Sequence, residues 1–224
     1  MNPYAVKACA ILIAVIAGAG AGMVEARTAY PTAPVSGADP AAKSCAACHG
    51  PHGNSTAPQF PKLAGQNPTY LADQLWAFKT KTRRSEAMAS FAARLSASEI
   101  AALARFYADQ PILPDTPTDR RLAERGRRVF YNGTGWPAPT PACAQCHGRG
   151  GGFGPPMMGG MMGPGMMGGG ASGPNLYGQH ASYIVAQLQQ FARGERPSWV
   201  MGRIAAGLTP QDRKAVAEYL ASRR

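Results

Sequence analysis

The chain carries the pattern Cys-x-x-Cys-His twice, at residues 45–49 and again at residues 143–147. A lone Cys-x-x-Cys is ambiguous, because thioredoxin-like redox sites and zinc ribbons use it too. A histidine directly after each second cysteine, in two pairs too distant along the chain to read as one zinc site, favours two covalently bound c-type haems. The predicted attachment residues are Cys45, Cys48, Cys143 and Cys146, and the predicted iron ligands are His49 and His147.

The first 26 residues have the pattern of a cleavable export signal. Lys7 precedes an apolar stretch from Ala8 to Ala21, and Val24 to Ala26 fits a small-x-small cleavage site. An uncleaved membrane anchor is the alternative, but the apolar run is short and rich in alanine and glycine. Residues 1–26 are therefore predicted to be a signal peptide, lost together with Cys9, and the mature chain is predicted to work in the periplasm.

The chain has a formal net charge of +11, and removal of the signal peptide leaves it unchanged because that segment holds one lysine and one glutamate. A basic surface indicates an acidic protein partner, nucleic acid or an anionic membrane face. Nucleic acid does not suit an exported haem protein. We expect steering toward an acidic docking patch on a redox partner or toward a membrane surface, with a merely solubilising surface as the alternative.

The two haem motifs lie in two similar halves. The segment 61–66 reads Pro-x-Leu-x-Gly-Gln and so does the segment 174–179. Leu63 to Met88 and Leu176 to Met201 both span 25 positions. The repeat predicts a duplicated domain. The predicted divisions are a first domain at 27–110, a proline-rich linker at 111–118 and a second domain at 119–224.

Each half is predicted to be mostly helical. Asn67 and Pro68 suit the start of one helix, and Ser96 with Glu99 forms a capping box at the start of another. An arginine-rich helix is expected from about 119 to 130. Neither half is long enough to build a large apolar core from side chains alone, so we expect poor folding without haem.

Methionine opposite histidine is a common second ligand of haem iron and raises its reduction potential. Met88 is the only methionine between the first haem motif and the second half, and Met201 has the equivalent spacing in that half. A core methionine that fills a gap is the alternative, but the matching interval favours ligation by both. Pro61 and Pro174 are placed where a loop carbonyl could accept the N–H of the proximal histidine and orient it.

Other aromatic and histidine residues carry weaker signals. Four aromatic residues are interpreted as packing against the rings, with hydrogen bonds to haem propionates as the alternative. These four are Tyr70, Trp76, Tyr183 and Trp199. His52 and His180 have no repeat partner, and both are predicted to be surface or loop residues. No catalytic residue is predicted.

On the two Cys-x-x-Cys-His-Gly motifs, the Pro-x-Leu-x-Gly-Gln loops and the two methionines, the chain resembles the two-haem cytochrome c4 family of duplicated class I cytochromes c. The resemblance covers nearly the whole mature chain. It implies an all-α fold of two tandem class I cytochrome c domains, each wrapped around one covalent haem. It also implies that His49 and Met88 ligate one iron, that His147 and Met201 ligate the other, and that electrons pass between a cytochrome bc complex and a terminal oxidase.

The second half departs from that pattern in two places. A stretch at 131–142, rich in proline and glycine, separates the opening helix from Cys143. A second insertion at about 154–170 places six methionines, Met157 to Met167, among glycines and prolines. A low-complexity loop is the simpler interpretation. The alternative is that the clustered thioethers bind Cu(I).

The leading hypothesis is thus a periplasmic electron carrier of a respiratory chain that turns over no substrate. An electron-accepting cytochrome subunit of a dehydrogenase complex is one alternative. A two-haem redox enzyme with one exchangeable axial ligand is another, although a methionine at the same place in both halves argues against it.

Overall fold

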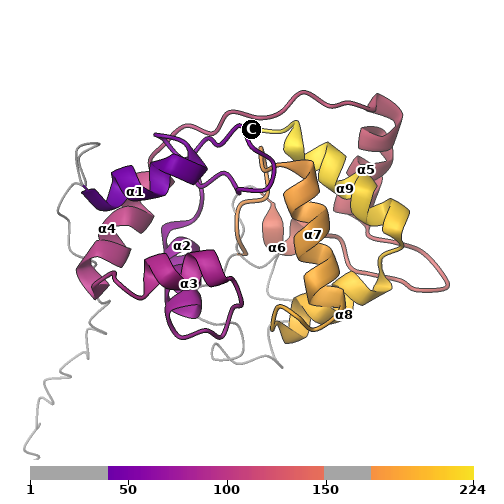
Figure 1. The fold of residues 1–224 in the computed structure, drawn as a ribbon. Coiled ribbons are helices and arrows are strands. Elements are labelled where there is room, and N and C mark those ends of the chain that lie inside the picture. The colour runs from indigo at the N-terminus through magenta and orange to yellow at the C-terminus, as the bar shows by residue number, and fades with distance from the viewer. Residues whose placement is uncertain (1–39, 149–172) are drawn as a thin grey trace, which may run out of the picture.

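A computed structural model describes residues 40–148 and 173–224 of the chain, drawn in Figure 1. The predicted signal peptide and the methionine-rich insertion with its possible Cu(I) site lie outside the described residues. In the part described, no helix is long and apolar enough to cross a membrane.

The described part of the first half is built from four helices. They are α1 (Pro40–His49), α2 (Pro68–Lys79), α3 (Glu86–Ala92) and α4 (Ala97–Ala108). The predicted helix starts are confirmed. The Asn67 side chain accepts from the Tyr70 backbone N–H with Pro68 in the first turn of α2, and Ser96 forms the capping box with Glu99 at α4. These caps satisfy backbone donors that the first helical turn leaves without an internal partner.

The second half repeats this plan with a separate opening helix. Its elements are α5 (Arg120–Asn132), α6 (Ala144–His147), α7 (Ala181–Ala192), α8 (Trp199–Gly207) and α9 (Pro210–Ala221). The arginine-rich helix predicted at 119–130 is α5, which runs two residues further and so takes in the first part of the predicted 131–142 insertion. The rest of that insertion is a loop in which a lone bridge joins Thr134 to Thr140, and no strand occurs elsewhere in the described ranges.

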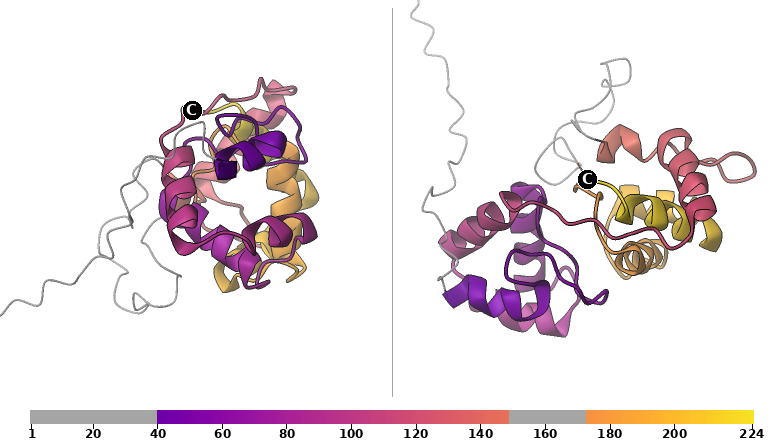
Figure 2. Two further views of the ribbon diagram at one scale, coloured as in Figure 1. Left: turned by 60° about the vertical axis from the view of Figure 1, so that its left-hand side comes forward. Right: turned by 90° about the horizontal axis from the view of Figure 1, so that it is seen from above.

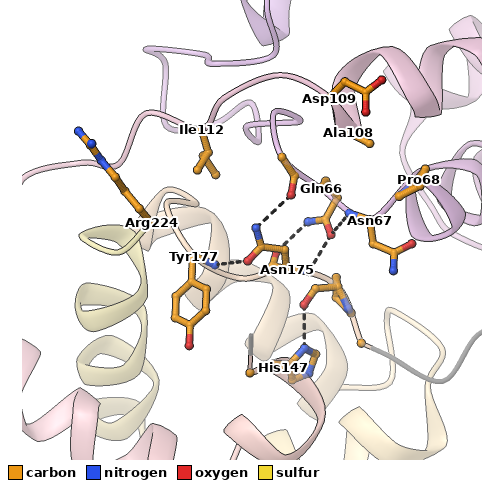
Figure 3. Close-up of a pocket in the computed structure, with 14 residues that line it drawn as sticks. Gln66, Asn67, Pro68, Ala108, Asp109, Ile112, His147, Asn175, Tyr177 and Arg224 are labelled. Atoms are coloured by element: carbon orange, nitrogen blue, oxygen red, sulfur yellow. Dashed lines mark hydrogen bonds between the residues drawn. The ribbon is translucent and has the colours of Figure 1, made fainter. Parts of the chain in front are cut away.

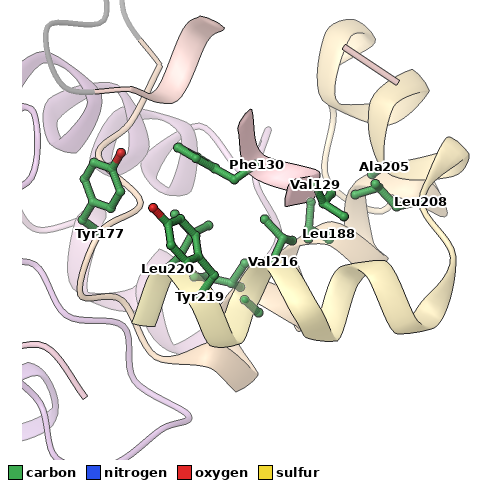
Figure 4. Packing of buried hydrophobic residues seen from close by; sticks show 11 residues of the cluster. Val129, Phe130, Tyr177, Leu188, Ala205, Leu208, Val216, Tyr219 and Leu220 are labelled. Atoms are coloured by element: carbon green, nitrogen blue, oxygen red, sulfur yellow. The ribbon is translucent and has the colours of Figure 1, made fainter. Parts of the chain in front are cut away.

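Each half has its own apolar core. In the first half, Leu71 of α2 packs with Ile100 and Leu103 of α4, and Cys45 contacts the cluster from its edge. In the second half, residues of α5, α7 and α9 meet around Phe130, which is fully buried (Figure 4). Met201 and Cys143 lie at the edge of this second core. The edge positions leave the predicted ligand and attachment residues beside apolar surface, where a porphyrin ring would extend the core.

Helices α5 and α9 cross so closely that the crossing requires glycine. A Cβ atom placed on Gly126 of α5 would lie 1.9 Å from the carbonyl oxygen of Ala215 and 2.9 Å from Cβ of Tyr219, both on α9. Glycine is unfavourable in the middle of a helix, so its presence here reflects the close approach of the two backbones.

The halves form two lobes that face each other across a joint, as the second view in Figure 2 shows. The segment between α4 and α5 runs over the top of that joint and is hydrogen-bonded to both lobes. Asn54 of the first lobe holds it at Pro111 and Leu113, and Glu218 of α9 accepts from Thr118 at its far end.

Candidate haem sites and the joint between them

The two haem motifs end on short helical turns. Cys45, Cys48 and His49 occupy the last turns of α1, and Cys146 and His147 lie on α6, with Cys143 at its N-cap. Burial raises the pKa of the Cys45 thiol and raises that of Cys143 to about 11. The first cysteine of each pair therefore sits in apolar surroundings, at the edge of the core of its lobe.

Each motif histidine is fixed by a backbone carbonyl from the following loop. Nδ1 of His49 lies 2.8 Å from the carbonyl oxygen of Pro61, and Nδ1 of His147 lies 3.0 Å from that of Pro174. Because a carbonyl only accepts, Nδ1 must carry the proton, which leaves the Nε2 lone pair available to a metal. Burial lowers the pKa of both histidines, while the carbonyl bond partly opposes this, so the neutral form is favoured.

Close packing also orients the second histidine. A Cβ atom on Gly173 would lie 2.7 Å from Nδ1 and Cε1 of the His147 ring, so only glycine leaves room for the ring in this position. The cleft of about 590 Å³ in Figure 3 lies between the lobes, with His147 on one wall and Gln66 on the other.

Met88 and Met201 occupy equivalent places in the two lobes. Each is the third residue of its helix, α3 or α8, and both are partly buried. Ser85 accepts from the Met88 backbone N–H, and Ser198 accepts in the same way from Met201. The same N-cap thus fixes the backbone of each methionine, so the equivalence predicted from spacing extends to local structure.

Two glutamines of the repeated loops bind the lobes together reciprocally. Gln179 accepts from the backbone N–H of Lys62 at 2.9 Å and donates to the Lys62 carbonyl at 2.8 Å. Gln66 forms the matching pair with Asn175, both bonds at 2.7 Å (Figure 3). Gln66 and Gln179 are equivalent in the repeat, as are Lys62 and Asn175, so the joint has approximate two-fold symmetry.

Two arginines form a second symmetric network across the joint, and the sequence analysis did not identify them. Arg83 of the first lobe donates to the Tyr183 hydroxyl at 2.9 Å and to Gln187 at 2.8 Å. Arg196 of the second lobe donates to the Tyr70 hydroxyl and to Gln74 of the first lobe, both at 2.8 Å. The signal that could have found them is their spacing, because the two arginines occupy equivalent positions of the repeat.

The structure adds contacts to the four aromatic residues, and their packing against the haem rings stays a prediction. The hydroxyls of Tyr70 and Tyr183 are acceptors for arginines of the opposite lobe, a contact between lobes that the sequence does not reveal. Trp76 and Trp199 are 40% and 64% exposed, and neither belongs to an apolar core in the described part of the chain.

His52 and His180, the two histidines without a repeat partner, lie in different environments. His52 is exposed, as predicted. His180 is not a surface residue, because it is only 4% exposed, but it does lie in the loop that leads into α7, at the N-cap position of that helix. Ser55 of the first lobe and Asp115 of the connecting segment cover its ring, and a contact of this kind between distant segments leaves no local pattern.

Comparisons with known proteins agree with this architecture. Residues 32–106 match the family described as cytochrome c oxidase, cbb3-type, subunit III, and residues 123–224 match the cytochrome c family. The chain is 38% identical to cytochrome c4 of Thiocapsa roseopersicina over 79% of this chain and 85% of that protein. It is 36% identical to a thiosulfate dehydrogenase electron acceptor of Thiomonas intermedia, over 83% of this chain and 81% of that one.

Two solved structures are similar to the whole arrangement of two lobes. Reduced cytochrome c4 from Pseudomonas stutzeri superposes with a TM-score of 0.67 at 31% identity, over 81% of this chain and 94% of that one. A thiosulfate dehydrogenase from Marichromatium purpuratum gives 0.63 at 32% identity, over 80% of this chain but only 36% of that chain. With two tandem cytochrome c domains and two covalently bound c-type haems, the chain belongs to the cytochrome c4 family of electron carriers.

Proposed function

We propose that His49 with Met88 and His147 with Met201 are the axial ligands of the two irons. The observation that carries this assignment is the matched pair of histidine–carbonyl bonds, which in each lobe uses Nδ1 as the hydrogen-bond donor and would leave the Nε2 lone pair to hold an iron. The thioether sulfurs of the methionines are soft donors that suit haem iron. When bound, each haem supplies a one-electron Fe(III)/Fe(II) couple.

Two positively charged arginines at the joint also suit the negatively charged propionate groups of haem. Arg83 and Arg196 donate only to neutral oxygens, and among residues 40–148 and 173–224 neither forms an ion pair with a carboxylate. Arg196 is 8% exposed, and a buried guanidinium without a counter-charge is unfavourable. The haem propionates would provide negative charge of the type that these arginines lack.

We further propose that the protein works in the periplasm and carries single electrons from a quinol-oxidising cytochrome bc complex to a terminal oxidase. The similarity to several cytochrome c4 proteins supports this. The net charge of +11 favours partners with acidic docking surfaces.

A second candidate is the role of electron acceptor for a thiosulfate-oxidising dehydrogenase. It is favoured by one specific observation, the similarity to two proteins described as thiosulfate dehydrogenase electron acceptors at 36% identity each. Both candidates use the same pair of haem sites, so they differ only in the protein that supplies the electrons.

Optical spectroscopy of the haem-loaded protein tests the ligands. We expect the methionine–iron charge-transfer band at the strength of two haems in the oxidised protein, and no binding of carbon monoxide in the reduced one. Met88→Ala and Met201→Ala should each remove half of the band and open one iron to carbon monoxide. A matched control replaces all six methionines between 157 and 167 by leucine and should change neither signal. Carbon monoxide binding to the unmodified protein would instead support an enzyme with an exchangeable ligand.

Stopped-flow reduction separates the two donors. The oxidised protein is mixed with membranes that contain a reduced cytochrome bc complex, and separately with a thiosulfate dehydrogenase plus thiosulfate. We expect fast reduction by the membranes, slowed by added salt because exposed charges are screened. Rapid reduction by the dehydrogenase alone would overturn the respiratory assignment and favour the second candidate.

A further inference from the structure

An acidic residue of the connecting segment lies at the centre of a charged cluster between the lobes. One carboxylate oxygen of Asp115 is 2.6 Å from Nζ of Lys62 in the first lobe, and the other is 2.8 Å from Nδ1 of His180 in the second lobe. The backbone N–H of Asp115 also donates to the carbonyl of Ala221 at the end of α9. Asp115 therefore holds both lobes at once, through side chain and backbone.

The ring of His180 is held on both of its nitrogen atoms. Nδ1 faces the Asp115 carboxylate, while Nε2 lies 3.0 Å from the carbonyl oxygen of Ser55 and 2.9 Å from its hydroxyl. The hydroxyl of Ser55 donates to the carbonyl of Phe60 at 2.6 Å, so it offers an oxygen lone pair to the ring. Hydrogen-bonding oxygens therefore face both nitrogens of the ring, and the Asp115 carboxylate that holds Nδ1 is at the same time ion-paired with Lys62.

This arrangement replaces a helix cap. His180 stands at the N-cap of α7, but its side chain accepts no hydrogen bond from that helix. At the equivalent position of the first lobe, Asn67 caps α2 through the Tyr70 backbone N–H. In a joint that is otherwise nearly symmetric, α7 lacks a side-chain cap, and the side chain at its N-cap position contacts the other lobe instead.

We propose that Asp115 and His180 are positioning residues that lock the two haem lobes in one relative orientation. The lock acts together with the reciprocal glutamine bonds and the two arginines, and it is the part of the joint in which the Asp115 carboxylate forms an ion pair with Lys62. The proposal rests on the proposed function, because a fixed orientation of the lobes matters when electrons pass between the haems that the two lobes carry. It assigns to the connecting segment a task beyond linking the domains.

Hydrogen exchange in the haem-loaded protein tests the lock through two reporter amides. The backbone N–H groups of Lys62 and Asn175 donate only across the joint, to Gln179 and Gln66, so their exchange reports opening between the lobes. The informative variant is His180→Asn, which removes the cross-lobe contacts and supplies α7 with the kind of cap that Asn67 gives α2. We expect both reporter amides to exchange roughly tenfold faster or more, because charged hydrogen bonds that favour the closed state are lost.

The second lobe itself provides the internal reference. In His180→Asn the amide of Leu220, in the core of α9, should exchange no faster than in the unmodified protein, since the new cap supports this lobe. Asp115→Asn should accelerate the same two reporters. Asp212→Asn is the matched control, because Asp212 pairs with Arg125 inside the second lobe and should leave the Lys62 amide unchanged.

Two results would overturn the lock. One is unchanged exchange at Lys62 and Asn175 in both lock variants, and the other is an equal acceleration of Leu220, which would mean that His180 only stabilises its own lobe. The methionine–iron band of the same samples separates this test from the proposed function. A full band with unchanged reporters rejects the lock alone, whereas a weak band in the unmodified protein rejects the ligand assignment.

Discussion

The close crossing of α5 and α9 predicts that Gly126→Ala destabilises the second lobe, although alanine is the better helix former. The added Cβ would lie 1.9 Å from the oxygen and 2.4 Å from the carbon of the Ala215 carbonyl group. Both atoms belong to the backbone of a buried helix, so they cannot rotate away as a flexible side chain would. The two helices must separate, and the contacts around Phe130 and Tyr219 loosen with them.

The magnitude follows from two opposing terms. Replacing glycine by alanine inside a helix favours folding by up to about 1 kcal/mol. Overpacking of a close contact typically costs about 1–3 kcal/mol, and contact with rigid backbone belongs at the upper end. We expect a net loss of about 2 kcal/mol in the free energy of unfolding, which for a domain of this size lowers Tm by roughly 10 °C.

Thermal unfolding of the haem-loaded protein, followed by circular dichroism, measures this loss. Gly202→Ala is the matched control, because Gly202 is also a helical glycine of the second lobe and a Cβ there would meet only the Phe191 carbonyl oxygen at an ordinary 3.5 Å. We expect Tm of the control to stay constant or rise. A Gly126→Ala variant as stable as Gly202→Ala would refute the argument from backbone contact.

Three further predictions concern the joint and one helix start. Burial alone would raise the pKa of Asp115, but the hydrogen bonds from Lys62 and His180 hold it below its ordinary value, so its stabilising effect is present above about pH 4 and is lost as the pH falls further. Small-angle scattering should show the lobes separating in that acid range, and less pH dependence in Asp115→Asn. Arg196→Ala should accelerate hydrogen exchange of the Lys62 and Asn175 amides severalfold, because Arg196 donates across the joint. Arg193→Ala should leave that exchange unchanged, because Arg193 is exposed. Thr209→Ala removes the cap of α9 and should lower the free energy of unfolding by about 1 kcal/mol in urea.

The sequence predicts features that depend on local chemistry. The haem motifs, the caps at Asn67 and Ser96 and the two repeated loops are short patterns, and the helices appear where those patterns place them. The positions of Met88 and Met201 also follow, because a duplicated spacing carries information that a single methionine does not.

The joint could be predicted only in part. The glutamines at 66 and 179 belong to the repeat and were noticed, but nothing local indicates that each one binds the opposite loop. The environment of His180 was missed because its partners come from segments far away along the chain, brought together only when the lobes meet. Repetition reveals which residues correspond, whereas contact between repeats depends on their packing.

The reciprocal glutamine bonds have a consequence for the strength of the joint. Its described contacts include the neutral glutamine bonds and several bonds to charged groups, and such bonds contribute only about 1 kcal/mol net each when neutral and about 1.5–3 kcal/mol when charged. Two separate chains would have to offset the loss of translational and rotational freedom before such a surface could associate. The short segment between α4 and α5 makes association intramolecular, with an effective concentration in the millimolar range. Proteolytic cleavage of that one segment should therefore convert a single two-haem protein into two cytochromes that diffuse independently.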